Sequence, residues 1–98
     1  MTLTTNFINM EHNHEIEQFI KSLVLKTFPD AQCIDSILIN LKVVNDNHLP
    51  WKCHIYLTEP GKSTLEVESG AANYLTAFSQ ALMRIKRQFE KSNDGLRA

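Results

Sequence analysis

The sequence predicts a single α+β domain with the order β-α-β-β-β-α, in which two helices pack on one face of a four-stranded sheet. The chain has 98 residues, which is enough for one hydrophobic core and too few for two. Two segments repeat apolar residues at helical spacing, and four others have the alternation or β-branched composition of strands. Hydrophobic residues make up 43% of the chain and charged residues 21%, as is typical of a folded domain.

The first half of the chain predicts a strand, a helix and a second strand. Residues 3–8 are rich in Thr and contain Phe7 and Ile8, which favours a strand at a sheet edge. Asn13 can cap a helix that has one apolar face and ends near Pro29. That face consists of Ile16, Phe19, Ile20, Leu23, Val24 and Thr27. Apolar residues then alternate with period two over residues 34–44, which predicts a long strand.

The second half predicts a hairpin and a second helix. Residues 51–57 and 64–68 alternate, and the segment 59–62 between them contains the Pro and Gly of a tight turn. Gly70 ends the alternation, and Asn73 can cap a helix whose apolar face continues to about Lys91. Residues 92–98 are mostly small and polar, which predicts a flexible tail after a domain that occupies residues 1–91.

The apolar faces of the two helices predict how the layers pack. Because each helix has one such face, both are expected to cover the same side of an antiparallel sheet. The other sheet face is then solvated. It would carry Lys42, Lys52, His54, Tyr56, Glu66 and Glu68.

The charges are unevenly distributed along the chain. Residues 82–98 carry five basic and two acidic side chains, a net charge of +3, whereas residues 1–81 carry five basic and nine acidic ones, a net charge of −4. The total of −1 therefore conceals a basic C-terminal end on an acidic body. This asymmetry indicates a polyanionic partner.

Three cations of the second predicted helix form a basic stripe. Arg84, Arg87 and Lys91 lie within about 60° of one another on the side opposite the apolar face, with Lys86 on the flank of the stripe. Their spacing of roughly 5–10 Å is comparable to that of successive phosphates, so the stripe can follow a nucleic-acid backbone. The alternative is a solvated helix end whose cations offset the helix dipole. The residues alone leave both interpretations open.

The remaining reactive residues predict no catalytic site. No spacing of Cys and His matches a zinc site, and no metal is expected. Cys53 and His54 are neighbours on a strand, so they point to opposite faces and cannot act as nucleophile and base. Phosphate-binding loops are absent, so we expect neither a cofactor nor a small-molecule substrate. Tyr56 lies beside Lys52 and His54 on the open sheet face, and a platform on which nucleic-acid bases stack is a further interpretation of these residues.

The location of the protein is predicted from the absence of export and membrane signals. No apolar run reaches the roughly 20 residues of a membrane span, and the N-terminus does not read as a secretory signal. Cys33 and Cys53 are then expected to be reduced thiols. The sequence predicts a soluble, cytoplasmic protein.

The order of the elements and several motifs resemble the ribosome hibernation promoting factor and protein Y family, also called ribosome-associated inhibitor or ribosomal subunit interface proteins. The resemblance covers about residues 3–91 and is most specific in the second helix. There, residues 73–78 (NYLTAF) look like the family's D-M-Y-A-A-I, and residues 84–88 (RIKRQ) look like its K-L-x-R-Q. Residues 65–70 (LEVESG) stand where the family has its last strand and a Gly.

The resemblance implies a domain similar in outline to double-stranded RNA-binding domains. It also implies a non-enzymatic factor that binds rRNA of the small ribosomal subunit, in the channel for messenger and transfer RNA. Such a factor inhibits translation in idle cells by steric exclusion. Basic residues of both helices make the main contacts in this family. Carried over to this sequence, they are Lys26, Arg84, Lys86, Arg87 and Lys91.

The chain also departs from the family. Glu17 stands where a basic residue is frequent, Asn73 replaces an Asp, and the first helix has only Lys21 and Lys26 as cations. This thin positive charge leaves an alternative open, namely a protein-interaction module that uses the open sheet face or the edge strand near Leu3. A third hypothesis is a small enzyme that uses Cys53 or His54. The sequence does not indicate the oligomeric state.

Overall fold

Six elements follow one another in the computed structural model, which describes residues 1–29 and 33–97 and the side chains as far as residue 92. The strands are β1 (Thr2–Ile8), β2 (Ser36–Val43), β3 (Trp51–Thr58) and β4 (Leu65–Ala71). The helices are α1 (His14–Thr27) and α2 (Tyr74–Arg97). The predicted order β-α-β-β-β-α is confirmed.

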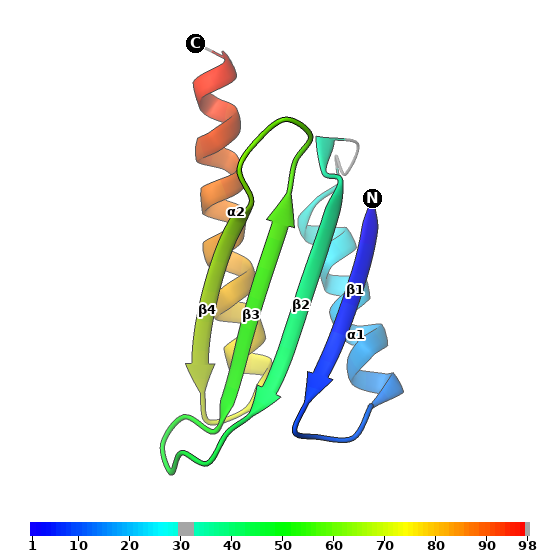
Figure 1. The fold of residues 1–98 in the computed structure, drawn as a ribbon, viewed down its shortest axis with the longest axis vertical. Helices are drawn as coiled ribbons and strands as arrows, with labels where there is room; N and C mark the ends of the chain where they lie inside the picture. Colours follow the sequence, from blue (N-terminus) through cyan, green and yellow to red (C-terminus); the bar gives the residue numbers. More distant parts are fainter. Residues whose placement is uncertain (30–32, 98) are drawn as a thin grey trace.

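The four strands form one mixed sheet in the order β1-β2-β3-β4 (Figure 1). β2, β3 and β4 are antiparallel neighbours. β1 pairs with β2 in parallel, with Thr2 opposite Ser36 and Ile8 opposite Lys42. The expectation of an antiparallel sheet is therefore wrong for β1. The reason is that α1 connects β1 to β2. This helix brings the chain back to the end of the sheet at which β1 begins, so β2 runs in the same direction as β1.

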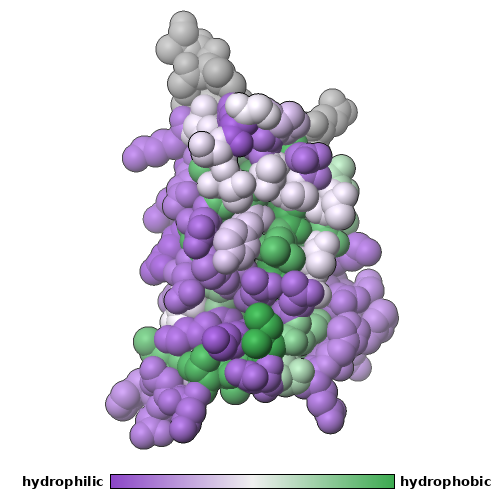
Figure 2. All heavy atoms as spheres, viewed as in Figure 1, coloured by the Kyte–Doolittle hydropathy of each residue, from purple (hydrophilic) through white to green (hydrophobic). Residues whose placement is uncertain are grey.

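Both helices lie behind the sheet in Figure 1, so the prediction that they share one face is confirmed. The core fills the space between them and the sheet, where Ile20, Ile39, Ile55, Phe78 and Ile85 are fully buried. Figure 2 shows the opposite, uncovered face, on which hydrophilic residues dominate the margins and hydrophobic residues gather nearer the centre. The alternating burial along β3, with Cys53 buried and His54 partly exposed, places the predicted polar residues on this open face.

Side-chain caps begin both helices. The side-chain oxygen of Asn13 accepts a hydrogen bond from the backbone N–H of Ile16 at 3.0 Å. The side chain of Asn73 does the same for Thr76 at 2.8 Å. Each cap satisfies a donor that the first turn of a helix leaves without an acceptor. The helix starts predicted from Asn13 and Asn73 are confirmed.

The end of α2 lies further along the chain than the sequence predicts. The helix continues to Arg97, whereas its predicted end was near Lys91. Extending a packed helix adds one backbone hydrogen bond for each residue fixed, and residues 92–97 contain no Pro to stop it. The helix boundary was therefore wrong. The division into a domain over 1–91 and a tail over 92–98 stays a prediction, and the tail's side chains beyond residue 92 lie outside the described part.

Two glycines of the β3–β4 hairpin have different roles, one in its turn and one in β4. Gly61 has a positive φ of 73° in the turn between β3 and β4, where the backbone N–H of Lys62 donates to the carbonyl oxygen of Glu59 at 3.2 Å. Gly70 does not end β4 as predicted, because the strand continues to Ala71. A Cβ at Gly70 would lie 2.8 Å from the Nζ of Lys52. The glycine therefore leaves room for the Lys52 side chain to lie across β4.

Among the helices in the described part of the chain, none is long and apolar enough to cross a membrane.

Replacing Asn13 with Ala should lower the free energy of unfolding by about 1 kcal/mol, because the N–H of Ile16 loses its acceptor. Chemical denaturation followed by circular dichroism measures this change. Asn45→Ala is the matched control in an exposed loop, and it should change the stability by less than about 0.5 kcal/mol. An Asn13→Ala protein as stable as the parent would contradict the capping role.

Candidate nucleic-acid interface

The predicted basic residues of α2 are all exposed and lie on the helix surface that faces away from the core. Arg84, Lys86, Arg87 and Lys91 are exposed, whereas Ile85 between them is fully buried. With about 100° of turn per residue, Arg87 points almost directly away from the sheet. Arg84 then lies on one flank of the helix and Lys86 on the other.

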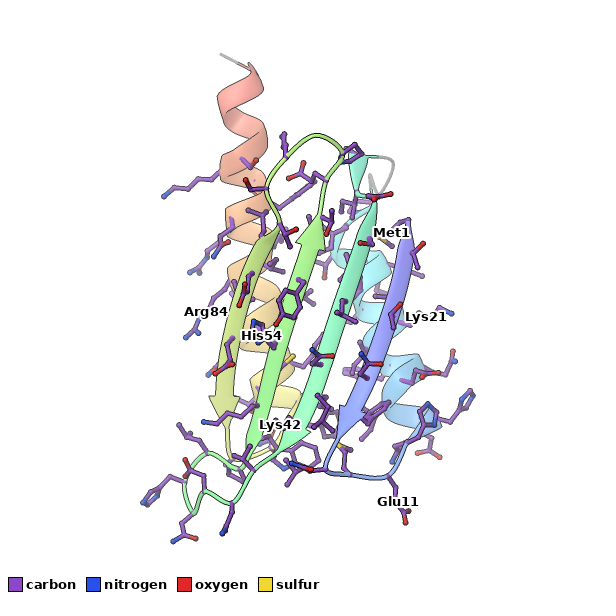
Figure 3. The ribbon with its side chains drawn as sticks, in the orientation of Figure 1. Met1, Glu11, Lys21, Lys42, His54 and Arg84 are labelled. Atoms are coloured by element: carbon purple, nitrogen blue, oxygen red, sulfur yellow. The ribbon has the colours of Figure 1, made fainter. Side chains whose placement is uncertain are left out.

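Two contacts identify these flanks. The Nη1 of Arg84 donates a hydrogen bond to the backbone carbonyl oxygen of Glu68 at 2.8 Å, so the Arg84 flank faces β4. Figure 3 shows Arg84 beside this strand. The ring of Phe89 packs edge-on against the ring of Phe28 at the end of α1, with 5.4 Å between the centroids. The Lys86 flank is adjacent to Phe89 and therefore faces α1.

The structure consequently divides the five predicted binding residues into two groups. Arg84, Arg87 and Lys91 lie within about 60° of one another along α2, and we call them the outer basic row. Lys86 lies about 100° further round the helix from Arg87, toward α1. Lys26 is exposed in the last turn of α1, where a cation also stabilises the negative end of the helix dipole. Lys26 and Lys86 are thus separated from the outer basic row.

The outer basic row keeps its charge available. Among the described side chains, the ion pairs involve His12, His54 and Lys62, and none involves a cation of α2. Glu90 is the acidic residue that shares a shallow surface hollow with Arg87 and Lys91. A polyanion that approaches this side of α2 would therefore meet cations that form no ion pair with a carboxylate among the described side chains.

The open face of the sheet has a different character near its middle. The rings of His54 and Tyr56 stack, with centroids 4.3 Å apart and planes inclined by 16°. The Nε2 of His54 lies 2.7 Å from a carboxylate oxygen of Glu66, and its Nδ1 lies 3.4 Å from one of Glu68. One face of the Tyr56 ring is therefore covered and carboxylates lie beside it. This arrangement disfavours the base-stacking platform, because carboxylates repel phosphates.

His54, Tyr56, Glu66 and Glu68 form what we call the His54 cluster. The sequence predicts that these residues lie on one face of the sheet but not that they contact one another. The signal is the strand register. His54 lies opposite Glu68, and Tyr56 lies opposite Glu66, on β3 and β4. Diagonal and direct cross-strand neighbours are close enough for such side chains to interact. The turn at residues 59–62 alone would place Val67 opposite His54, one residue short of the observed partner Glu68, so the turn does not give this register by itself.

Cys53 does not have the properties of a catalytic thiol. It is fully buried, and burial raises its pKa to about 12. The thiol therefore stays protonated near neutral pH, and only a thiolate is an effective nucleophile. His54 lies on the opposite face of the sheet. In residues 1–29 and 33–92, no group of three His, Cys, Asp or Glu side chains is arranged to hold a metal ion.

A thiol reagent at about pH 8 should label Cys33 and leave Cys53 unmodified in the folded protein, because Cys33 is exposed and Cys53 is buried with a raised pKa. Intact-protein mass spectrometry counts the labels. The Cys33→Ser variant should take up a label only after denaturant is added. Rapid labelling of Cys53 in the folded variant would contradict the prediction and restore the enzyme hypothesis.

The fold and the site together define an α+β domain with a cation-bearing helix surface on one side and a partly acidic open sheet on the other. Solved structures with this fold include a ribosomal subunit interface protein from Coxiella burnetii, with a TM-score of 0.83 and 13% identity over 96% of this chain and 99% of that one. They also include the N-terminal domain of Thermus thermophilus Protein Y, with a TM-score of 0.75 and 18% identity over 93% and 98%. No family model and no curated protein matches the chain.

At these identities, the likeness establishes the fold. It confirms the fold that the resemblance implied, and both structures carry names of the protein group that the motifs of the second helix indicated. The site residues stay predictions, because a shared fold does not identify which side chains make contacts.

Proposed function

We propose that this protein associates with the ribosome in the cytoplasm, binding rRNA of the small subunit in the channel for messenger and transfer RNA, and that it inhibits translation in idle cells. The fold it shares with a ribosomal subunit interface protein and with Protein Y supports the partner. The observation that carries the proposal is the outer basic row, which is exposed and has no carboxylate partner among the described side chains.

The charge distribution would orient the domain on RNA. The outer basic row lies on α2, whereas Glu66 and Glu68 lie on the open face of the sheet. Lys42 and Lys52 balance these two carboxylates on the open face, so attraction to phosphates is concentrated on α2, which favours an approach with α2 first. The row continues to Lys91, whose side chain is exposed. Lys26 at the end of α1 and Lys86 on the flank of α2 that faces α1 would make further contacts with RNA.

The mechanism needs no chemistry. A folded domain that occupies the channel excludes messenger and transfer RNA because two molecules cannot fill the same volume. The buried Cys53, with its raised pKa, agrees with a role that does not depend on a nucleophile. Release would follow from competition for the same phosphates.

A protein-interaction module is the alternative function. It is favoured by the His54 cluster, in which Glu66 and Glu68 place two carboxylates beside the stacked rings of His54 and Tyr56. Such a local acidic group suits a basic side chain of a protein better than an RNA phosphate. The two functions are distinguished by nuclease treatment of a pull-down. Loss of the partner with the RNA supports ribosome binding, and a stoichiometric protein that resists nuclease supports the alternative.

Replacing Arg87 and Lys91 with Glu should reduce co-sedimentation with small ribosomal subunits at low salt by at least tenfold, because two phosphate contacts are replaced by repulsion. These residues are preferable to Arg84, whose hydrogen bond to Glu68 also holds the structure. Lys21→Glu/Lys42→Glu changes the net charge equally on other surfaces, as Figure 3 shows, and should bind nearly as the parent does. Equal loss in both double variants would mean that net charge, and not this site, controls binding.

Salt should weaken the association steeply. If about four phosphates are contacted, raising the salt concentration from about 50 to 200 mM should lower the association constant on the order of 100-fold, because bound counterions are released. Sedimentation of the purified protein with small subunits over this range measures the slope. The Arg87→Glu/Lys91→Glu protein should show a shallower slope than the parent. Binding that does not change with salt would contradict a phosphate-based interface.

A further inference from the structure

The two edges of the sheet are protected very differently. Edge strands expose unpaired backbone groups, and most proteins block them with charged residues, Pro, bulges or covering segments. On the β4 edge, Arg84 covers the carbonyl oxygen of Glu68, and Glu66 and Glu68 add charge. β1 has the sequence TLTTNFI, which contains no charged residue, Pro or Gly, and its pairing with β2 shows no bulge. The backbone edge of β1 therefore remains open to another strand, and at its end the ring of His12 packs edge-on against Phe7 with 5.1 Å between the centroids.

The outward-facing groups of β1 follow from the register. The backbone N–H of Thr2 donates to the carbonyl oxygen of Asp35 at 3.0 Å, so Thr2 faces the β2 side. In a parallel ladder, alternate residues bond to the same neighbour. Thr4 and Asn6 therefore also face β2, and Leu3, Thr5 and Phe7 direct their N–H and C=O groups outward. No residue in the described part of the chain bonds to these three, so an added antiparallel strand could form about six hydrogen bonds.

Beside this edge there is a groove with α1 as its wall. Leu3 and Thr5 of β1 and Glu17 and Lys21 of α1 line a single pocket. Leu3 is only partly buried against the core, so a strand added here would cover apolar surface as well as backbone. The groove combines an unpaired edge with a helix, which is the arrangement that extended peptides occupy when they add a strand to a sheet.

A second copy of this chain fits the groove poorly through its own β1. Pairing two β1 strands antiparallel would place both α1 helices on the same face, above strands about 4.8 Å apart. Packed helices need about 8–10 Å between their axes. Because residues of α1 line the groove beside β1, each helix would stand next to the seam between the paired strands and the two would crowd each other. The occupant that fits best is therefore a strand with no helix behind it, namely an extended segment of another protein.

Glu17 and Lys21 define which segment fits. α1 runs back along β1, so Glu17 lies nearer the end of β1 and Lys21 nearer its start. A strand antiparallel to β1 meets Glu17 first. Side chains two residues apart on a strand share a face and are separated by about 6.8 Å, close to the roughly 5–6 Å between residues one helical turn apart. The Nε2 of His12 lies 2.7 Å from one carboxylate oxygen of Glu17, so a basic residue of the strand would share this carboxylate with His12. Complementary charges would then be a basic residue followed two positions later by an acidic one.

We propose that the groove between β1 and α1 binds an extended peptide segment as a fifth strand antiparallel to β1, with a basic residue facing Glu17 and an acidic residue two positions later facing Lys21. This site lies on the β1 edge, away from the outer basic row on the β4 side of α2. It can therefore operate or fail independently of ribosome binding.

Two synthetic peptides test the proposal. The first is acetyl-Thr-Val-Thr-Lys-Thr-Glu-Thr-Val-amide, and the second has its Lys and Glu exchanged. Titration into isotope-labelled protein, followed by NMR, should shift the amide signals of Leu3, Thr5 and Phe7 and leave that of Glu66 unchanged. The exchanged peptide should bind about fivefold more weakly, because two exposed charge pairs become repulsive. No shift in β1 with either peptide, or equal affinity for both, would overturn the proposal.

Protein variants locate the site. Thr5→Pro removes an outward N–H that β2 does not use and is tolerated at a sheet edge, so it should abolish peptide binding. Thr4→Ser changes a side chain on the open face and should bind as the parent does. Glu17→Lys/Lys21→Glu should reverse the preference between the two peptides, which tests the charges even if Thr5→Pro fails to fold. An unchanged preference in this double variant would show that the charges do not select the peptide and would overturn the assignment.

Discussion

The inner face of the sheet is buried beneath α1 and α2, and this burial fixes how both helices are oriented. Ile39 and Ile55 of the sheet and Ile20 and Phe78 of the helices have no exposed surface. Each such side chain contributes about 1.5–3 kcal/mol when it is buried. Neither helix can rotate about its axis without exposing several of them. With the rotation of α2 fixed in this way, Arg87 has no direction available except away from the sheet.

The helical faces and their caps could be predicted from the sequence because both are local properties. The spacing of apolar residues identifies the buried side of a helix, and Asn13 and Asn73 supply acceptors to residues only three positions away. The direction of β1 could not be obtained in this way, since the same alternation suits parallel and antiparallel pairing. The end of α2 was missed because small polar residues weaken a helix without stopping it.

For the candidate site too, only the features local to one helix could be predicted from the sequence. Helical periodicity placed Arg84, Arg87 and Lys91 on one side, and the structure agrees with that geometry. The hydrogen bond from Arg84 to Glu68, the separation of Lys86 and the groove beside β1 all depend on how distant elements pack. Periodicity within one helix contains no information about that packing. The structure from Coxiella burnetii has the same fold at 13% identity. The pattern of buried positions therefore determines this fold more than the identity of the residues does.

Arg84 bonds to a main-chain oxygen and not to a side chain. The acceptor is therefore present whatever amino acid occupies position 68, and mutations there could accumulate over generations without releasing the guanidinium. Position 84 has no such latitude, since only a long side chain with a donor at its tip spans the distance from helix to strand. Natural variation should accordingly be asymmetric across this contact, permissive on β4 and restrictive on α2.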